Sequence, residues 1–369
     1  MNRASLNTFL SGMMMLFLVF SAPAQNTSSS FSQSLSFSAA LHYGFSNPAN
    51  IKLESIQNSR SFLEELDISS QTTGQKIWQQ QAGYPIIGLS FLFGQSGSSQ
   101  YIGNIAAILP FINGSIYRKD FFKLGWRFGI GPGWVQKPFN PQSNYQDLVI
   151  GSHLNACVNL QLFSTLKIWQ KISINLGLSF THLSNGSVKL PNLGLNMPAL
   201  TLGVCYYLHP HPAMVKRSLP LIPKKWNFFL FTFLAIKEAP PLESPPGWVN
   251  LLSFEVMRTI SSSGRVGGGI NLTYDRTLRT EIPNSLTFAF DDSKLKLEAS
   301  LYGSYEYVMG NLSIPIQLGA YLYNNYVISE IYENIGVRWR LSPHWLAGMS
   351  LKAHLVKADF IQWGLGFQF

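Results

Sequence analysis

The segment from residue 122 to 130 reads Phe122-Lys123-Leu124-Gly125-Trp126-Arg127-Phe128-Gly129-Ile130. Every even position holds a large apolar residue, and every odd position holds glycine or a cation. Because successive side chains of a β-strand point to opposite faces, this alternation gives the strand one apolar face. The same pattern recurs over 171–181 and 361–369, so it predicts a chain built mainly of strands.

The composition narrows the class of protein. Charged residues make up only 12% of the 369 residues, the net charge is +9, and aromatic residues reach 14%. A chain so rich in aromatic residues is not disordered, and its thinly spread positive charge predicts no nucleic-acid partner. Two cysteines cannot build a disulfide framework. Since no carboxylate or histidine cluster has metal-ligand spacing, neither a metal nor a cofactor is predicted.

The N-terminus predicts export. Arg3 precedes an apolar stretch over 9–20, and Ala22-Pro23-Ala24 fits a signal-peptidase site. Residues 1–24 are therefore predicted to be a signal peptide that is removed after Ala24. An uncleaved membrane anchor is the alternative, although the apolar stretch is short for a spanning helix.

Beyond residue 24, two readings of the alternation compete. In a water-soluble β-sandwich the apolar faces would point inward, whereas in a membrane barrel they would face lipid. The segments are long for globular strands, tyrosines and tryptophans lie near their ends, and the chain finishes on Phe369 after an alternating aromatic strand. That ending resembles the assembly signal of outer-membrane barrels. We therefore predict an antiparallel transmembrane β-barrel in the outer membrane of a Gram-negative bacterium, inserted by the barrel assembly machinery.

Sixteen candidate strands can be placed, an even number as such a barrel needs. They are 34–45, 59–72, 78–94, 104–117, 121–135, 148–163, 170–184, 196–208, 225–237, 247–259, 265–277, 295–308, 312–325, 329–341, 345–355 and 359–369. One barrel of about 14–16 strands is the first interpretation. The alternative is an eight-stranded barrel over 25–209, a Pro-rich basic linker over 210–224 and a second barrel over 225–369. Connections after even-numbered strands are mostly short, which predicts that both termini face the periplasm.

The residues suited to chemistry lie at the end of the seventh candidate strand. His182 and Ser184 are two apart, so they share a face, and an imidazole there can take the proton of the hydroxyl while that hydroxyl attacks an ester. Asn196 has the matching parity on the next strand. All three are expected to point outward, near the extracellular rim. The competing interpretation is a set of interfacial polar residues that caps a strand end.

The stretch Phe180-Thr181-His182-Leu183-Ser184-Asn185-Gly186, followed by Pro191-Asn192-x-Gly194-x-Asn196, resembles the lipid A 3-O-deacylases (PagL) and their acyloxyacyl hydrolase relatives. The similarity extends over roughly residues 58–208. It implies an eight-stranded barrel with a lipid-facing serine esterase site that removes an acyl chain from lipid A. It further implies Ser184 as nucleophile, His182 as general base, and Asn185, Gly186 and Asn192 as residues that form or shape the oxyanion hole.

One position departs from the family pattern. Where these enzymes carry a glutamate that orients the histidine, this chain carries Asn196. An amide oxygen can fix the tautomer of the histidine but supplies no negative charge.

The predicted function is hydrolysis of an acyl ester of lipid A in the outer leaflet. The alternative is a non-catalytic barrel, either a pore or a structural scaffold, and a metal-dependent phospholipase is a distant third.

Overall fold

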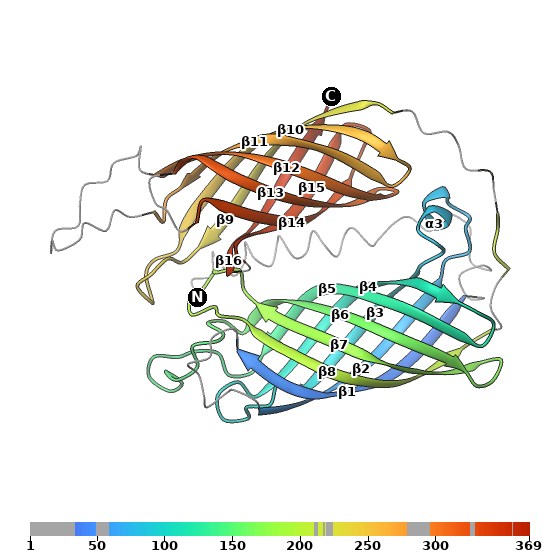
Figure 1. Cartoon of the computed structure of the whole chain (residues 1–369). Coiled ribbons are helices and arrows are strands. Elements are labelled where there is room, and N and C mark those ends of the chain that lie inside the picture. Colours follow the sequence, from blue (N-terminus) through green and yellow to red (C-terminus); the bar gives the residue numbers. More distant parts are fainter. Residues whose placement is uncertain are drawn as a thin grey trace. The chain divides into compact units, whose positions relative to one another are not determined.

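The computed structural model describes residues 34–48, 59–209, 213–216, 218, 224–278, 296–324, 329–355 and 357–369. Within these ranges the chain forms sixteen strands and one short helix, and the strands close into two eight-stranded antiparallel barrels (Figure 1). The predicted signal peptide, 1–24, and part of the predicted linker, 210–224, lie outside the described residues.

The first barrel contains the eight strands that precede the predicted linker. They are β1 (Leu35–Pro48), β2 (Ser59–Gln71), β3 (Ile86–Gln95), β4 (Asn104–Arg118), β5 (Phe122–Val135), β6 (Leu154–Lys167), β7 (Ile172–Ser184) and β8 (Leu195–Tyr207). Each strand pairs with its neighbour in sequence, and β8 returns to pair with β1, with Leu41 opposite Leu202.

The second barrel repeats this arrangement with the remaining eight strands. They are β9 (Trp226–Lys237), β10 (Gly247–Ser261), β11 (Gly264–Asp275), β12 (Leu297–Met309), β13 (Leu312–Asn324), β14 (Ile331–Arg340), β15 (Trp345–His354) and β16 (Lys357–Gln368). The last strand closes on the first, with Leu365 opposite Thr232.

Because the strands close into two separate barrels, our first interpretation is wrong and the alternative is confirmed. The single barrel of 14–16 strands is wrong, because β8 bonds to β7 along one edge and to β1 along the other. No edge of β8 is left for β9, whose two neighbours are β10 and β16.

The alternation of apolar and polar residues along the strands gives each barrel an outer face and an inner face of different character. On β7, Leu176 and Leu178 are each 58% exposed on the outer face, whereas Ser179 and Thr181 are buried on the inner face. The inner Thr181 accepts a hydrogen bond from Asn159 of β6 at 2.9 Å. An apolar outer face and a polar inner face are the pattern of a barrel surrounded by lipid, so the β-sandwich interpretation is wrong.

The interior of the first barrel is filled by a charged cluster. Arg127 on β5 donates to Glu65 at 2.5 Å and to Asp67 at 2.7 Å, both on β2. Gln161 of β6 donates a further hydrogen bond to Glu65 at 2.9 Å. Buried charges are tolerated when they are paired and hydrogen-bonded in this way.

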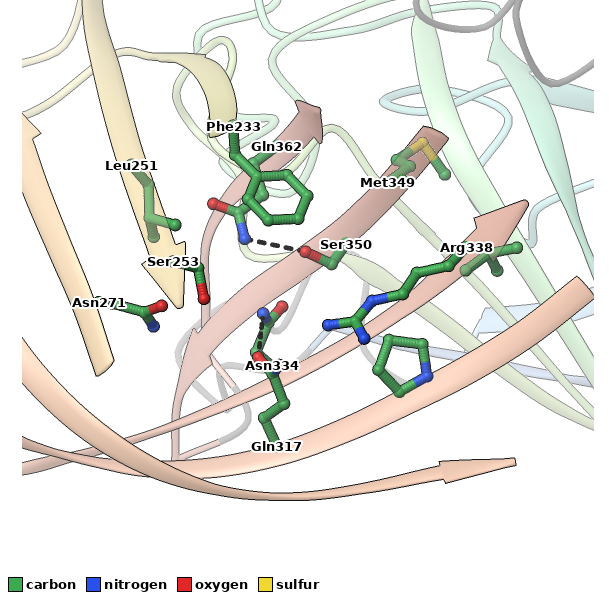
Figure 2. Close-up of a pocket in the computed structure, with 13 residues that line it drawn as sticks. Phe233, Leu251, Ser253, Asn271, Gln317, Asn334, Arg338, Met349, Ser350 and Gln362 are labelled. Atoms are coloured by element: carbon green, nitrogen blue, oxygen red, sulfur yellow. Dashed lines mark hydrogen bonds between the residues drawn. The ribbon is translucent and has the colours of Figure 1, made fainter. Parts of the chain in front are cut away.

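The second barrel is filled by a similar cluster around Arg338. Its guanidinium lies 2.6 Å from Glu255 and 3.4 Å from Glu306, and it stacks over Phe231 at 4.3 Å from the ring centroid. Figure 2 shows Arg338 among the polar side chains that line a small cavity beside this cluster, where Gln362 donates to Ser350 and Asn334 donates to Gln317.

All sixteen predicted strands occur, and two of them begin more than two residues later than expected. The helix α3 (Ile77–Gln81) occupies the start of the predicted strand 78–94, so β3 begins only at Ile86. The predicted strand 148–163 begins at Leu154, because Val149 and Ile150 are fully buried in the preceding loop. In the described ranges, no helix has both the length and the hydropathy needed to cross a membrane.

Candidate active site

The three predicted catalytic side chains meet on the outer face of the first barrel. His182 and Ser184 lie at the end of β7, and they continue the even series of outward-facing residues. The register of β7 against β8 places Asn196 directly opposite His182. Directly opposed residues on neighbouring strands share a face, so the pairing brings the amide to the imidazole.

A chain of two hydrogen bonds joins these side chains. His182 Nδ1 lies 2.6 Å from Asn196 Oδ1, and His182 Nε2 lies 3.0 Å from Ser184 Oγ. Because an amide oxygen only accepts hydrogen bonds, Nδ1 carries the proton of the neutral imidazole. The Nε2 atom is then left to accept the hydroxyl proton of Ser184, which is the arrangement that a general base requires.

The site is shielded from water. Ser184 is only 6% exposed although it lies on the outer face, and Asn196 is partly buried. Gly194, which has a positive φ of 80°, packs its backbone against the imidazole: a Cβ atom there would lie 2.7 Å from His182 Cε1. Only glycine suits this position, since both the left-handed backbone and the close approach exclude a side chain.

The loop between β7 and β8 contains the predicted oxyanion residues. Asn185 donates its backbone N–H to Asn192 Oδ1 at 2.9 Å and its side-chain N–H to Ser152 Oγ at 2.8 Å. Gly186 follows with a φ of 58°. Asn192 Nδ2 is buried and, within the described part of the chain, has no hydrogen-bond acceptor.

One supporting segment was missed from the sequence. The loop before β6 lies against the β7–β8 loop: Val149 O accepts N–H bonds from Leu193 at 3.0 Å and Gly194 at 3.2 Å, and Ile150 forms an isolated bridge with Asn192. The sequence carried no signal for these contacts, since residues 148–150 look like the start of a strand.

This supporting loop contains a buried acid. Asp147 is fully buried, its Oδ1 accepts the N–H of Val149 at 2.9 Å, and its Oδ2 has no partner among the described residues. Burial raises the pKa of Asp147 to about 7, although backbone N–H bonds from Val149 and Ile150 oppose the rise.

The free energy of unfolding should therefore fall as the pH rises from about 4 to about 7, because Asp147 is protonated in the folded protein over this range. Between about pH 4 and pH 7 the folded state keeps the Asp147 proton that the unfolded state has lost, so each pH unit costs up to about 1.4 kcal/mol. Asp147→Asn keeps the acceptor for Val149 and should remove this part of the pH dependence. Urea unfolding in detergent micelles at pH 4 to 8 measures it. Asp120→Asn, at an exposed position, is the matched control. Parallel pH profiles for wild type and Asp147→Asn would contradict the prediction.

Two family models match parts of the chain. Residues 65–205 match the family model of lipid A 3-O-deacylase (PagL), and residues 225–369 match that of the acyloxyacyl hydrolase C-terminal domain. No curated protein matches the chain.

Three of the solved structures that match the chain have low identity to it and low TM-scores. The neisserial surface protein A is 9% identical, with 47% of this chain and 96% of that one covered and a TM-score of 0.32. The outer membrane enzyme PagL is 18% identical, with 46% and 97% covered and a TM-score of 0.30. A mutant Rh. blastica porin is 10% identical, with 91% and 99% covered and a TM-score of 0.17.

Closed barrels with lipid-facing outer surfaces define the class: this is a β-barrel protein of the bacterial outer membrane. Within that class, residues 65–205 belong to the lipid A 3-O-deacylase (PagL) family, and residues 225–369 belong to the acyloxyacyl hydrolase C-terminal domain family.

Proposed function

We propose that the protein is an outer-membrane lipid A deacylase of the serine esterase type. The observation that carries the proposal is the pair of hydrogen bonds from His182, at 2.6 Å to Asn196 and 3.0 Å to Ser184, on the lipid-facing side of the barrel. Polar side chains on such a face are costly, which favours a functional role for them.

In this mechanism Ser184 Oγ attacks the carbonyl carbon of an acyl ester while His182 Nε2 takes the hydroxyl proton. Nε2 then returns that proton to the departing sugar oxygen, and the acyl group stays on Ser184. A water molecule, deprotonated by the same nitrogen, releases the fatty acid and restores the serine. Asn196 holds the imidazole in the tautomer that the first step needs.

The oxyanion of the tetrahedral intermediate needs donors beside Ser184. Asn192 Nδ2 is a buried donor without a partner among the described residues, and its amide is hydrogen-bonded to Asn185, the residue that follows the nucleophile. We assign the oxyanion to this amide, with the backbone N–H of Gly186 as the second donor, because the backbone N–H of Asn185 already donates to Asn192 Oδ1.

The depth of the site suits the substrate. If the barrel begins on the periplasmic side, β7 runs outward and Ser184 reaches the outer leaflet, where lipid A lies. The four exposed apolar residues of β7 that lead to it, Ile174, Leu176, Leu178 and Phe180, would contact the acyl chains.

The pore alternative is less well supported. The charged cluster around Arg127 occupies the interior of the first barrel, and the one around Arg338 occupies the interior of the second. Interiors filled by paired side chains favour closed barrels over open channels.

The mass spectrum of lipid A tests the proposal. Expression of the protein in a Gram-negative host should produce lipid A that has lost one acyl chain, relative to the same host with an empty vector. Unmodified lipid A, despite correct insertion judged by heat-modifiable electrophoretic migration, would favour the scaffold alternative.

Restoring the family's carboxylate should increase the rate. Asn196→Glu or Asn196→Asp should raise kcat at least about tenfold, because a carboxylate stabilises the imidazolium, and its loss in a related triad costs about 10⁴. Initial rates of acyl release on purified lipid A measure the effect. Asn175→Asp, at a position on β7 far from the site, is a matched control for the added charge. A lower rate in both carboxylate variants would contradict this role of Asn196.

A further inference from the structure

The orientation of the Asn192 amide is fixed by its neighbours. Its Oδ1 accepts the backbone N–H of Asn185 at 2.9 Å, so its Nδ2 must point the opposite way. That nitrogen is buried without an acceptor in the described part of the chain, which is unfavourable unless a bound molecule supplies one. A buried donor of this kind can bind an acceptor atom that the substrate brings.

Asn185 is itself held by Ser152, just before β6, and Ser152 is in turn held by Asn155 near the start of β6. Its side-chain nitrogen donates to Ser152 Oγ at 2.8 Å. Asn155 Nδ2 donates to Ser152 O at 2.8 Å, and Ser152 Oγ lies 3.3 Å from Asn155 Oδ1. The relative exposures of Asn155, Asn185 and Ser152 are 0%, 1% and 7%, so water cannot replace these bonds.

The same loop also fixes the backbone on the other side of Asn192. Val149 O receives the N–H groups of Leu193 and Gly194, and the Gly194 backbone lies against the imidazole of His182. One segment thus pairs with Asn192 through Ile150 and holds the residues around it through Val149 and Ser152.

We propose that Ser152 and Asn155 are positioning residues of the esterase site, which act through Asn185 to aim the amide of Asn192 at the oxyanion. The inference rests on the proposed function and extends it to a segment about 30 residues before the nucleophile in the chain. A short hydroxyl and a short amide suit this task because both are rigid and both donate and accept. Preorganised donors of this kind act mainly on the transition state.

The first test measures the labelling of Ser184 by a fluorophosphonate, which needs the nucleophile and the oxyanion donor but no lipid A. Ser152→Ala should slow labelling about tenfold, and Asn192→Ala about 100-fold. Ser152→Thr keeps the hydroxyl and should recover most of the rate. Ser164→Ala, which removes a hydroxyl on β6 away from the site, is the matched control and should label at the wild-type rate.

A double variant separates positioning from a general loss of structure. If Ser152 acts through Asn192, the variant that combines Ser152→Ala with Asn192→Ala should label no more slowly than Asn192→Ala alone. Multiplied effects would overturn the proposal, as would labelling of Ser152→Ala at the wild-type rate. Heat-modifiable migration shows that each variant forms its barrel.

Lipid A hydrolysis, measured on the same variants, distinguishes the two proposals. Here Ser152→Ala should lower kcat and leave KM unchanged. If the wild type is labelled but leaves lipid A intact, the proposed substrate is wrong and the labelling ratios still decide the positioning role. A wild type that resists labelling overturns both.

Discussion

Removal of either the hydroxyl or the imidazole should abolish lipid A deacylation. Ser184→Ala and His182→Ala should each lower kcat at least about 10³-fold, because a nucleophile and its base act as one unit. For the same reason, the double variant should be no slower than either single one. Loss of the acyl chain, followed by mass spectrometry on lipid A incubated with purified protein in detergent, measures these rates.

The control for these variants comes from the same strand. Ser173 lies on the lumen-facing side of β7, at the end away from the site, and Ser173→Ala should keep the wild-type rate. Heat-modifiable migration should be unchanged in Ser184→Ala and His182→Ala, since neither side chain lies in the barrel interior. Acyl release by Ser184→Ala at more than a few per cent of the wild-type rate would rule out the serine mechanism.

The second large effect should be on stability, in the other barrel. Arg338→Met leaves Glu255 without its cation, and Glu306 with only Arg265 at 2.8 Å, although both carboxylates are fully buried. Breaking a buried ion pair by removing one partner costs about 3–5 kcal/mol. Urea unfolding in micelles, followed by the fluorescence of tryptophan, should show a midpoint well below that of the wild type.

Two further variants make this prediction specific. Arg338→Met leaves the carboxylate of Glu255 buried without its cation. Removing that carboxylate as well, by combining Arg338→Met with Glu255→Leu, should recover much of the lost free energy of unfolding. The exposed Arg276 on the loop after β11 provides the control, and Arg276→Met should change stability by less than about 0.5 kcal/mol. A single variant Arg338→Met with the stability of the control would show that the cluster contributes little.

The strands and their faces could be predicted from the sequence because the signal is local. A residue's face follows from whether its position is odd or even, so Leu176, Leu178 and His182 were placed on the outer face without any knowledge of the partner strands. The prediction held wherever a strand was continuous. It was wrong at the start of β3, where the short helix α3 replaces the expected strand, and at the start of β6, where Val149 is buried by a folded loop rather than by a sheet.

The candidate site could be predicted only in part from the local sequence pattern. The shared face of His182 and Ser184 followed from their spacing, whereas the contact with Asn196 depended on the register of β7 against β8. Ser152 and Asn155 carried no sequence signal, because their bonds to the site cross about 30 residues of chain.

The sequence by itself thus determined that this chain forms lipid-facing strands, with a histidine and a serine on the outer face at the end of one of them. The number of barrels was decided only by the tertiary structure. Alternation with a period of two is the same in a barrel of eight strands and in one of sixteen, since it records the two faces of a strand and not its neighbours. The pairing of Leu41 with Leu202, across more than 150 residues of chain, closes the first barrel, and that long-range choice of partner leaves no mark on the local pattern.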